Sequence, residues 1–87
     1  MEITPRQIAE EYYKAYPNEL LNGEGKRMEI EEHAFKNWYE RFLKEPESAT
    51  SLSKDNWAGK VTAALLRLKG IKRPKNKTEL LKVLQEN

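Results

Sequence analysis

The sequence contains no cysteine, and among its 87 residues there are only one histidine, four prolines and four glycines. Without cysteine there is no disulfide framework, no thiolate zinc site and no cysteine nucleophile. No run approaches the roughly 20 apolar residues of a membrane-spanning helix. The first residues lack the basic and then apolar pattern of a signal peptide. We therefore expect a cytoplasmic protein with no membrane partner.

Side chains suited to catalysis are equally scarce. His33 is the only histidine, and no second histidine or convergent carboxylate accompanies it as a base partner or metal ligand. The segment 23–27 has two glycines before a lysine, but it lacks the spacing and the Ser/Thr of a phosphate-binding P-loop. The sequence thus predicts no enzyme, no catalytic residue, no bound metal and no cofactor.

Charged side chains are abundant but divided unevenly between the two halves. Residues 1–50 carry seven Lys/Arg and eleven Glu, a net charge of −4. Residues 51–87 carry nine Lys/Arg and three Asp/Glu, a net charge of +6. Such asymmetry indicates a nucleic acid or another charged partner. The alternative is a set of solvated helix faces whose charges are uneven for no functional reason.

Apolar residues recur at helical spacing, and no segment alternates apolar and polar residues as a half-buried strand would. We expect helices over about 4–16, 26–44, 54–70 and 77–87, with Leu20 and Leu21 forming an additional short helical turn. The fold class predicted is all-α, a small bundle of four or five helices. We expect one domain, residues 1–87, with an acidic and aromatic part (1–47) and a basic helical hairpin (52–87).

Local signals mark the ends of these helices. Thr4 and Asn76 are followed three residues later by Gln or Glu, the pattern of a capping box, and Ser53 is a further candidate cap. Gly70 is expected to end the third helix, and Gly59 inside it is expected to permit a close helix–helix approach. Aromatic residues fall at helical spacing, and most are expected in the core because so short a chain has little else to build one from. They are Tyr12, Tyr16, Phe35, Trp38, Tyr39, Phe42 and Trp57.

A basic segment follows the third helix. Five cations within nine residues bracket the junction to the last helix, whose N-terminal N–H groups and dipole favour an anion. Cations in such a place bind a phosphate backbone largely independently of sequence. The candidate nucleic-acid-binding residues are Lys69, Lys72, Arg73, Lys75 and Lys77, with Lys60 and Arg67 in the preceding helix.

The segment 65–84 resembles the SAP-like group of helix–extended-loop–helix DNA-binding motifs. Gly70-Ile71 matches the group's helix end, residues 77–81 (Lys-Thr-Glu-Leu-Leu) match the start of its second helix, and Leu84 closes the pattern. The resemblance covers about residues 57–85 and implies DNA binding through the loop and the start of the last helix. Phage-encoded members often have a Gly-Ile-x-x-Pro-like loop, as residues 70–74 do, which is compatible with a phage or mobile-element origin. A winged helix-turn-helix over 51–75 ranks lower, because its wing needs a β-hairpin where residues 76–87 predict a helix.

Two functions from different classes remain open. The first is a nucleic-acid-binding module of low sequence specificity, with DNA favoured over RNA. The second is a protein-binding adaptor or inhibitor that presents an acidic surface to a basic partner, as a mimic of nucleic acid for example. The acidic candidates are Glu24, Glu29, Glu31, Glu32 and Glu40. Either function is compatible with a monomer or a weak homodimer.

Overall fold

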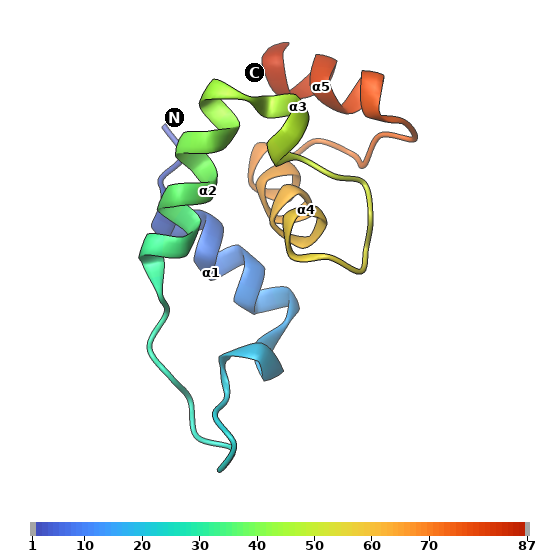
Figure 1. The fold of residues 1–87 in the computed structure, drawn as a ribbon. Helices are drawn as coiled ribbons and strands as arrows, with labels where there is room; N and C mark the ends of the chain where they lie inside the picture. The colour runs from blue at the N-terminus through green and yellow to red at the C-terminus, as the bar shows by residue number, and fades with distance from the viewer. Residues whose placement is uncertain (1, 87) are drawn as a thin grey trace.

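The computed structural model describes residues 2–86, and over these residues the chain forms five α-helices and one short 3-10 helix, with no strand. The all-α bundle predicted from the sequence is therefore confirmed. The elements are α1 (Pro5–Ala15), the 3-10 helix η1 (Pro17–Leu20), α2 (Glu32–Lys44), α3 (Pro46–Ala49), α4 (Trp57–Lys69) and α5 (Lys77–Glu86) (Figure 1).

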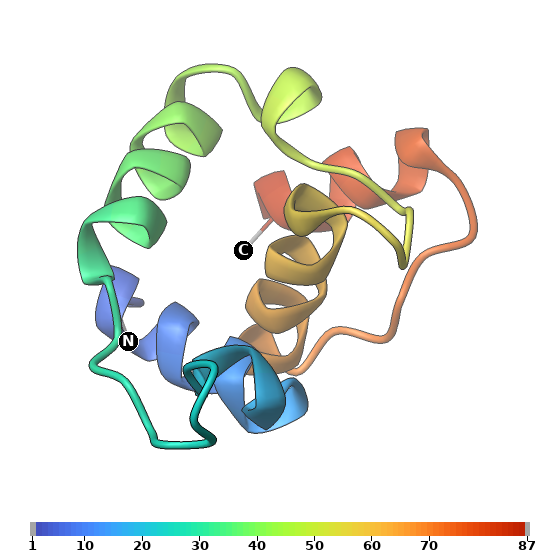
Figure 2. The same ribbon diagram turned by 60° about the horizontal axis from the view of Figure 1, so that its bottom comes forward.

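The core lies where α1 meets both α2 and α4, and Figures 1 and 2 show α4 between α1 and α5. Tyr12 and Phe35 are almost fully buried, with ring centroids 5.5 Å apart. Trp38 is buried on α2, and its indole N–H donates to the carbonyl of Ala49, which ties α3 to α2. Leu80 of α5 is fully buried in the same cluster. All the larger helices therefore contribute to one hydrophobic core.

Two of the three predicted N-terminal caps are present. The Thr4 hydroxyl accepts from the Gln7 N–H while the Gln7 side chain accepts from the Thr4 N–H, a complete capping box. At the start of α5 the Asn76 side chain accepts from the Glu79 N–H at 2.9 Å. The prediction of Ser53 as a cap is wrong, because α4 begins at residue 57 with Asn56 as its cap. The Asn56 side chain accepts from the Gly59 N–H in the first turn of α4, whereas the Ser53 hydroxyl accepts from the N–H of Asp55, before the helix.

The second helix is shorter than predicted. It begins at residue 32 rather than near 26, because residues 21–31 form a projecting arm (the segment that leaves η1 and returns to α2; Figure 1). At its tip the N–H of Gly25 donates to the carbonyl of Asn22, and Gly25 has a φ of 78°. This is a tight turn followed by a left-handed residue, which joins antiparallel segments. Leu21 and Arg27 pair as an isolated antiparallel bridge.

Two further expectations need correction. A Cβ at Gly59 would overlap the carbonyl oxygen of Ser53. The absence of a side chain at Gly59 therefore makes room for the connector (residues 50–56, between α3 and α4) rather than for another helix. Trp57, expected in the core, is 39% exposed, because it is the first residue of α4 and lies at the edge of the aromatic cluster beside Phe35. The short helical turn expected at Leu20 and Leu21 is present as η1 with Leu20 buried, but Leu21 follows the helix in an extended conformation and is 39% exposed.

Candidate nucleic-acid interface

The loop between α4 and α5 is anchored at its beginning by a glycine-based helix end. Gly70 has a φ of 70° and a ψ of 27°, the left-handed conformation that glycine adopts at little cost. Its N–H donates to Arg67, and the N–H of Ile71 donates to Leu66 at 2.9 Å, the hydrogen-bond pattern of a Schellman motif. Ile71 is half-buried against the core. The chain therefore leaves α4 in a defined direction toward residues 72–76.

Two of the candidate cations hold this loop against the connector that precedes α4. The guanidinium of Arg73 donates to the carbonyl of Leu52, and the ammonium of Lys77 donates to the carbonyl of Thr50. Thr50 is buried, and its hydroxyl donates to the carbonyl of Pro46 at 2.6 Å. Arg73 and Lys77 thus use hydrogen-bonding capacity within their own chain and fix the position of the loop.

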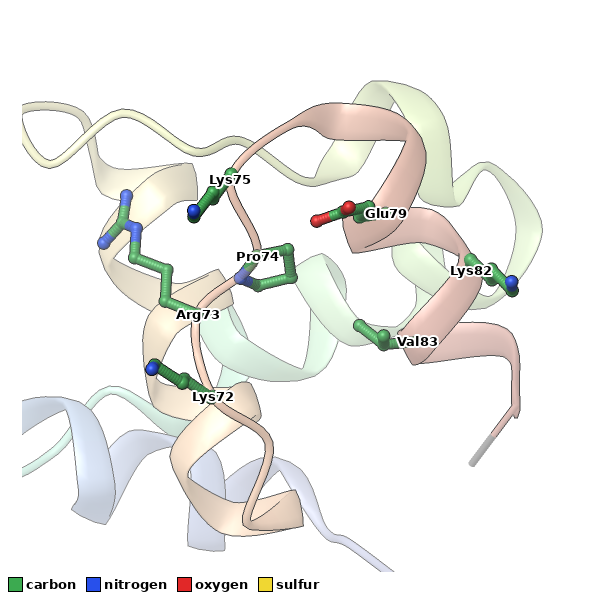
Figure 3. Close-up of a pocket in the computed structure, with 7 residues that line it drawn as sticks. All are labelled: Lys72, Arg73, Pro74, Lys75, Glu79, Lys82 and Val83. Carbon is green, nitrogen blue, oxygen red and sulfur yellow. The ribbon is translucent and has the colours of Figure 1, made fainter.

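The remaining cations of the loop face solvent around a shallow hollow (Figure 3). Lys72 and Lys75 are exposed, and neither forms an ion pair within residues 2–86. Lys82 of α5 lines the same hollow. Glu79, in the first turn of α5, points toward the loop in Figure 3 and adds one negative charge there. The hollow is therefore lined by four cations, Arg73 included, and one carboxylate.

Sequence reasoning missed Lys82, although a signal for it exists. Residues 75, 79 and 82 are separated by four and three positions, and this spacing places side chains on one face of a helix. Lys75 lies before the first residue of α5, so the helical spacing does not strictly apply to it. Glu79 and Lys82 both lie within α5, three residues apart, and this spacing alone places their side chains on the same face. Because they share this face, the carboxylate of Glu79 and the ammonium of Lys82 line the same hollow.

Three candidates from α4 lie apart from this hollow. Lys60 donates to a Glu19 carboxylate oxygen at 3.1 Å and lies 4.9 Å from the centre of the Tyr16 ring. The Nε of Arg67 donates to Glu11 at 3.1 Å. Both pairs join α4 to the α1–η1 segment, so the charges of Lys60 and Arg67 are compensated by carboxylates. Lys69, near the end of α4, is half-buried.

Glu19 is held by two donors from different elements. The Tyr12 hydroxyl donates to it at 2.6 Å, and the Lys60 ammonium donates from α4. The hydrogen bond from Tyr12 is the main cause that lowers the pKa of Glu19, and Lys60 adds to it. Burial, followed by this hydrogen bond, raises the pKa of Tyr12 well above its usual range. The cluster is a structural tie between η1, α1 and α4.

The acidic candidates are all exposed but do not form one compact patch. Glu24 lies at the tip of the arm, 4.0 Å from the Lys26 ammonium, and Glu29 lies on the returning segment. Glu31 and Glu32 mark the start of α2. Glu40 is eight residues further along α2, about 12 Å at 1.5 Å per residue. A partner would have to cover both the arm and two turns of the helix to contact all of them.

The structure also describes the surroundings of the one histidine and of the acidic side chains. His33 is exposed at the second position of α2. No group of three or more His, Asp or Glu within residues 2–86 is arranged to hold a metal ion. None of the helices in this range has the length and apolar character needed to cross a bilayer. Comparisons of the chain with protein-family models, curated proteins and solved structures give no match.

Proposed function

We propose that this chain is a small, non-enzymatic nucleic-acid-binding protein that contacts phosphates through the loop between α4 and α5. Lys72, Arg73, Lys75 and Lys82 supply the charge. The observation that supports it best is the exposure of Lys72 and Lys75 on a loop whose two ends are held in place. A cation on an anchored loop loses less conformational freedom on binding than one on a mobile tail.

The contacts available favour the backbone over the bases. Lysine is a flexible point charge, and phosphate contacts made by such side chains carry no sequence information. Readout of base edges requires Arg, Asn or Gln side chains that reach a groove together. Among the cations at the hollow only Arg73 is an arginine, and it donates to Leu52 of its own chain. We therefore expect low sequence specificity, and the resemblance to SAP-like motifs favours DNA over RNA.

The experiment compares binding of a labelled, random-sequence DNA duplex by the wild-type protein and by a charge-reversal variant. Lys72→Glu/Lys75→Glu reverses the charge of the two exposed lysines of the loop and leaves Arg73 in contact with the connector. The matched control is Lys26→Glu/Lys36→Glu, which makes the same change of net charge at exposed positions of the acidic half.

We expect wild-type binding with a dissociation constant of about 10⁻⁴–10⁻⁶ M at moderate salt, the range of non-specific complexes. The loop variant should lose at least about tenfold in affinity, since it loses two phosphate contacts with their counterion release and places two negative charges beside the backbone. The control should stay within about threefold, because only the long-range charge effect remains. Equal losses in the two variants, or no binding by the folded protein at low salt, would refute the proposal.

A second candidate function is a protein-binding adaptor or inhibitor that uses the acidic surface. One observation favours it: Leu21 and Met28, 39% and 44% exposed, lie on the same arm as Glu24 and Glu29, so a partner that contacts the arm would bury apolar surface as well as meet negative charge. Reversal of Glu31, Glu32 and Glu40 to lysine should abolish that function and leave duplex binding intact. The loop variant should do the opposite.

A further inference from the structure

A groove in the acidic half of the chain has three cations and one carboxylate among its lining residues. It lies between α1 and the returning segment of the arm, and Arg6, Lys14 and Arg27 line it together with a single carboxylate, Glu10. Arg6 and Glu10 lie 3.9 Å apart on α1. Lys14 and Arg27 form no ion pair within the described range. Residues 1–50 have a net charge of −4, so the fold concentrates positive charge at one place in an acidic segment.

The inner surface of the groove is apolar. Leu20 is buried there, and Tyr13 and Ile30 are half-buried and packed against the core. Tyr13 lies edge-on to Tyr12 and to Phe35, with centroids 5.0 and 5.8 Å away. The groove therefore combines an aliphatic and aromatic floor with a cationic rim.

The arm that forms one wall is held in a defined shape. The Asn22 side chain accepts hydrogen bonds from the N–H groups of Glu24 and Lys26, at 2.8 and 3.0 Å. The N–H of Met28 donates to the carbonyl of Leu20 at 2.7 Å, which joins the returning segment to η1. A wall fixed by these bonds makes the groove available to a ligand without a large ordering cost.

We propose that this groove binds an acidic peptide segment of a partner protein, with an aliphatic side chain on the floor and carboxylates beside Arg27 and Lys14. Opposite charge at the rim sets the orientation of such a segment and speeds its encounter. The buried apolar side chain supplies the affinity that exposed ion pairs do not.

The surroundings favour a peptide over nucleic acid. A phosphate backbone carries regular charge, and it would meet Glu10 inside the groove and Glu29 and Glu31 beside it. Burial, followed by the charges of Glu19 and Glu31, raises the pKa of Tyr13 on the groove floor. A peptide places its carboxylates only where the cations are, and it also carries the aliphatic side chains that the floor accepts.

The test uses a fluorescein-labelled peptide of alternating glutamate and leucine, measured by fluorescence anisotropy against the full chain. Arg27→Glu reverses a charge inside the groove, and Lys26→Glu makes the same change at the neighbouring residue, which is 78% exposed and lies outside it. We expect at least about a tenfold loss for Arg27→Glu, against about twofold or less for Lys26→Glu. Arg27→Gln removes the charge without reversing it and should give an intermediate loss.

Further measurements distinguish peptide binding in this groove from anion binding by the loop between α4 and α5. The Lys72→Glu/Lys75→Glu variant should keep its peptide affinity within about threefold, because only the long-range charge effect remains. Amide NMR shifts caused by the peptide should centre on residues 13–14 and 27–30. A peptide of alternating lysine and leucine should not bind. Absence of binding, equal effects of the Arg27 and Lys26 reversals, loss of binding in the loop variant, or loss of duplex binding in Arg27→Glu would each overturn the proposal.

Discussion

Replacement of Gly59 by alanine provides a sharp stability test, because two physical arguments give opposite signs. Gly59 lies in the first turn of α4, where alanine has the higher helix propensity by about 1 kcal/mol. Propensity alone therefore predicts a more stable protein. The structure predicts the reverse, because the added Cβ would overlap the carbonyl oxygen of Ser53 and lie 3.1 Å from the cap oxygen of Asn56.

The size of the loss follows from what must move. The atom in the way belongs to the backbone of the connector, so the connector itself has to shift, and forced overpacking of this kind costs about 1–3 kcal/mol. The Asn56 cap, 2.7 Å from the Gly59 N–H, would be disturbed as well, and a lost cap costs about 1 kcal/mol. After the gain in propensity, the net destabilisation is about 1–3 kcal/mol.

Thermal unfolding followed by circular dichroism measures this directly. For a domain of this size, 1 kcal/mol corresponds to about 4–8 °C, so Gly59→Ala should lower the Tm by about 4–24 °C. Gly23→Ala is the matched control, since a Cβ there has no neighbour within 4 Å, and it should leave the Tm nearly unchanged. A Tm for Gly59→Ala equal to or above that of the wild type would refute the account of the connector.

Three more predictions follow from other parts of the molecule. Trp38→Phe removes the donor to the buried carbonyl of Ala49 and should lower the unfolding free energy in urea by about 1–3 kcal/mol. The pKa of Glu19 is lowered in the folded state, so its stabilisation is present above the ordinary carboxyl pKa and is lost as the pH falls through the folded value. The Tm of the wild type should therefore drop more steeply than that of Glu19→Gln between about pH 5 and pH 3. If four phosphates are contacted, duplex affinity should fall about 150-fold between about 50 and 200 mM salt, and only about 12-fold for Lys72→Glu/Lys75→Glu.

Sequence patterns predicted the features that depend on neighbouring residues. The capping box at Thr4, the cap at Asn76 and the left-handed end at Gly70 each involve residues within a few positions of one another. The start of α2 was missed because the arm depends on a turn that pairs Leu21 with Arg27, and the apolar periodicity of the helix continues weakly through that region. Gly59 was misread because its neighbour is a connector rather than a helix.

The candidate site was predictable in position but not in composition. The density of cations located the loop, whereas the pairings of Lys60 with Glu19 and of Arg67 with Glu11 span 41 and 56 residues. Such long-range pairs depend on how α1 packs against α4, which no local pattern encodes. The cationic groove was missed for the same reason, since Arg6, Lys14 and Arg27 are scattered through an acidic half of the sequence.

The central claim, that the loop between α4 and α5 is a phosphate-binding surface, is tested most directly by NMR. A ¹⁵N-labelled wild-type protein is titrated with a short random-sequence duplex at low salt, and the amide shifts are mapped onto the chain. The account predicts that the largest shifts fall within residues 71–83 and diminish as salt is added. Shifts centred on the arm and the start of α2, or shifts that do not respond to salt, would contradict it.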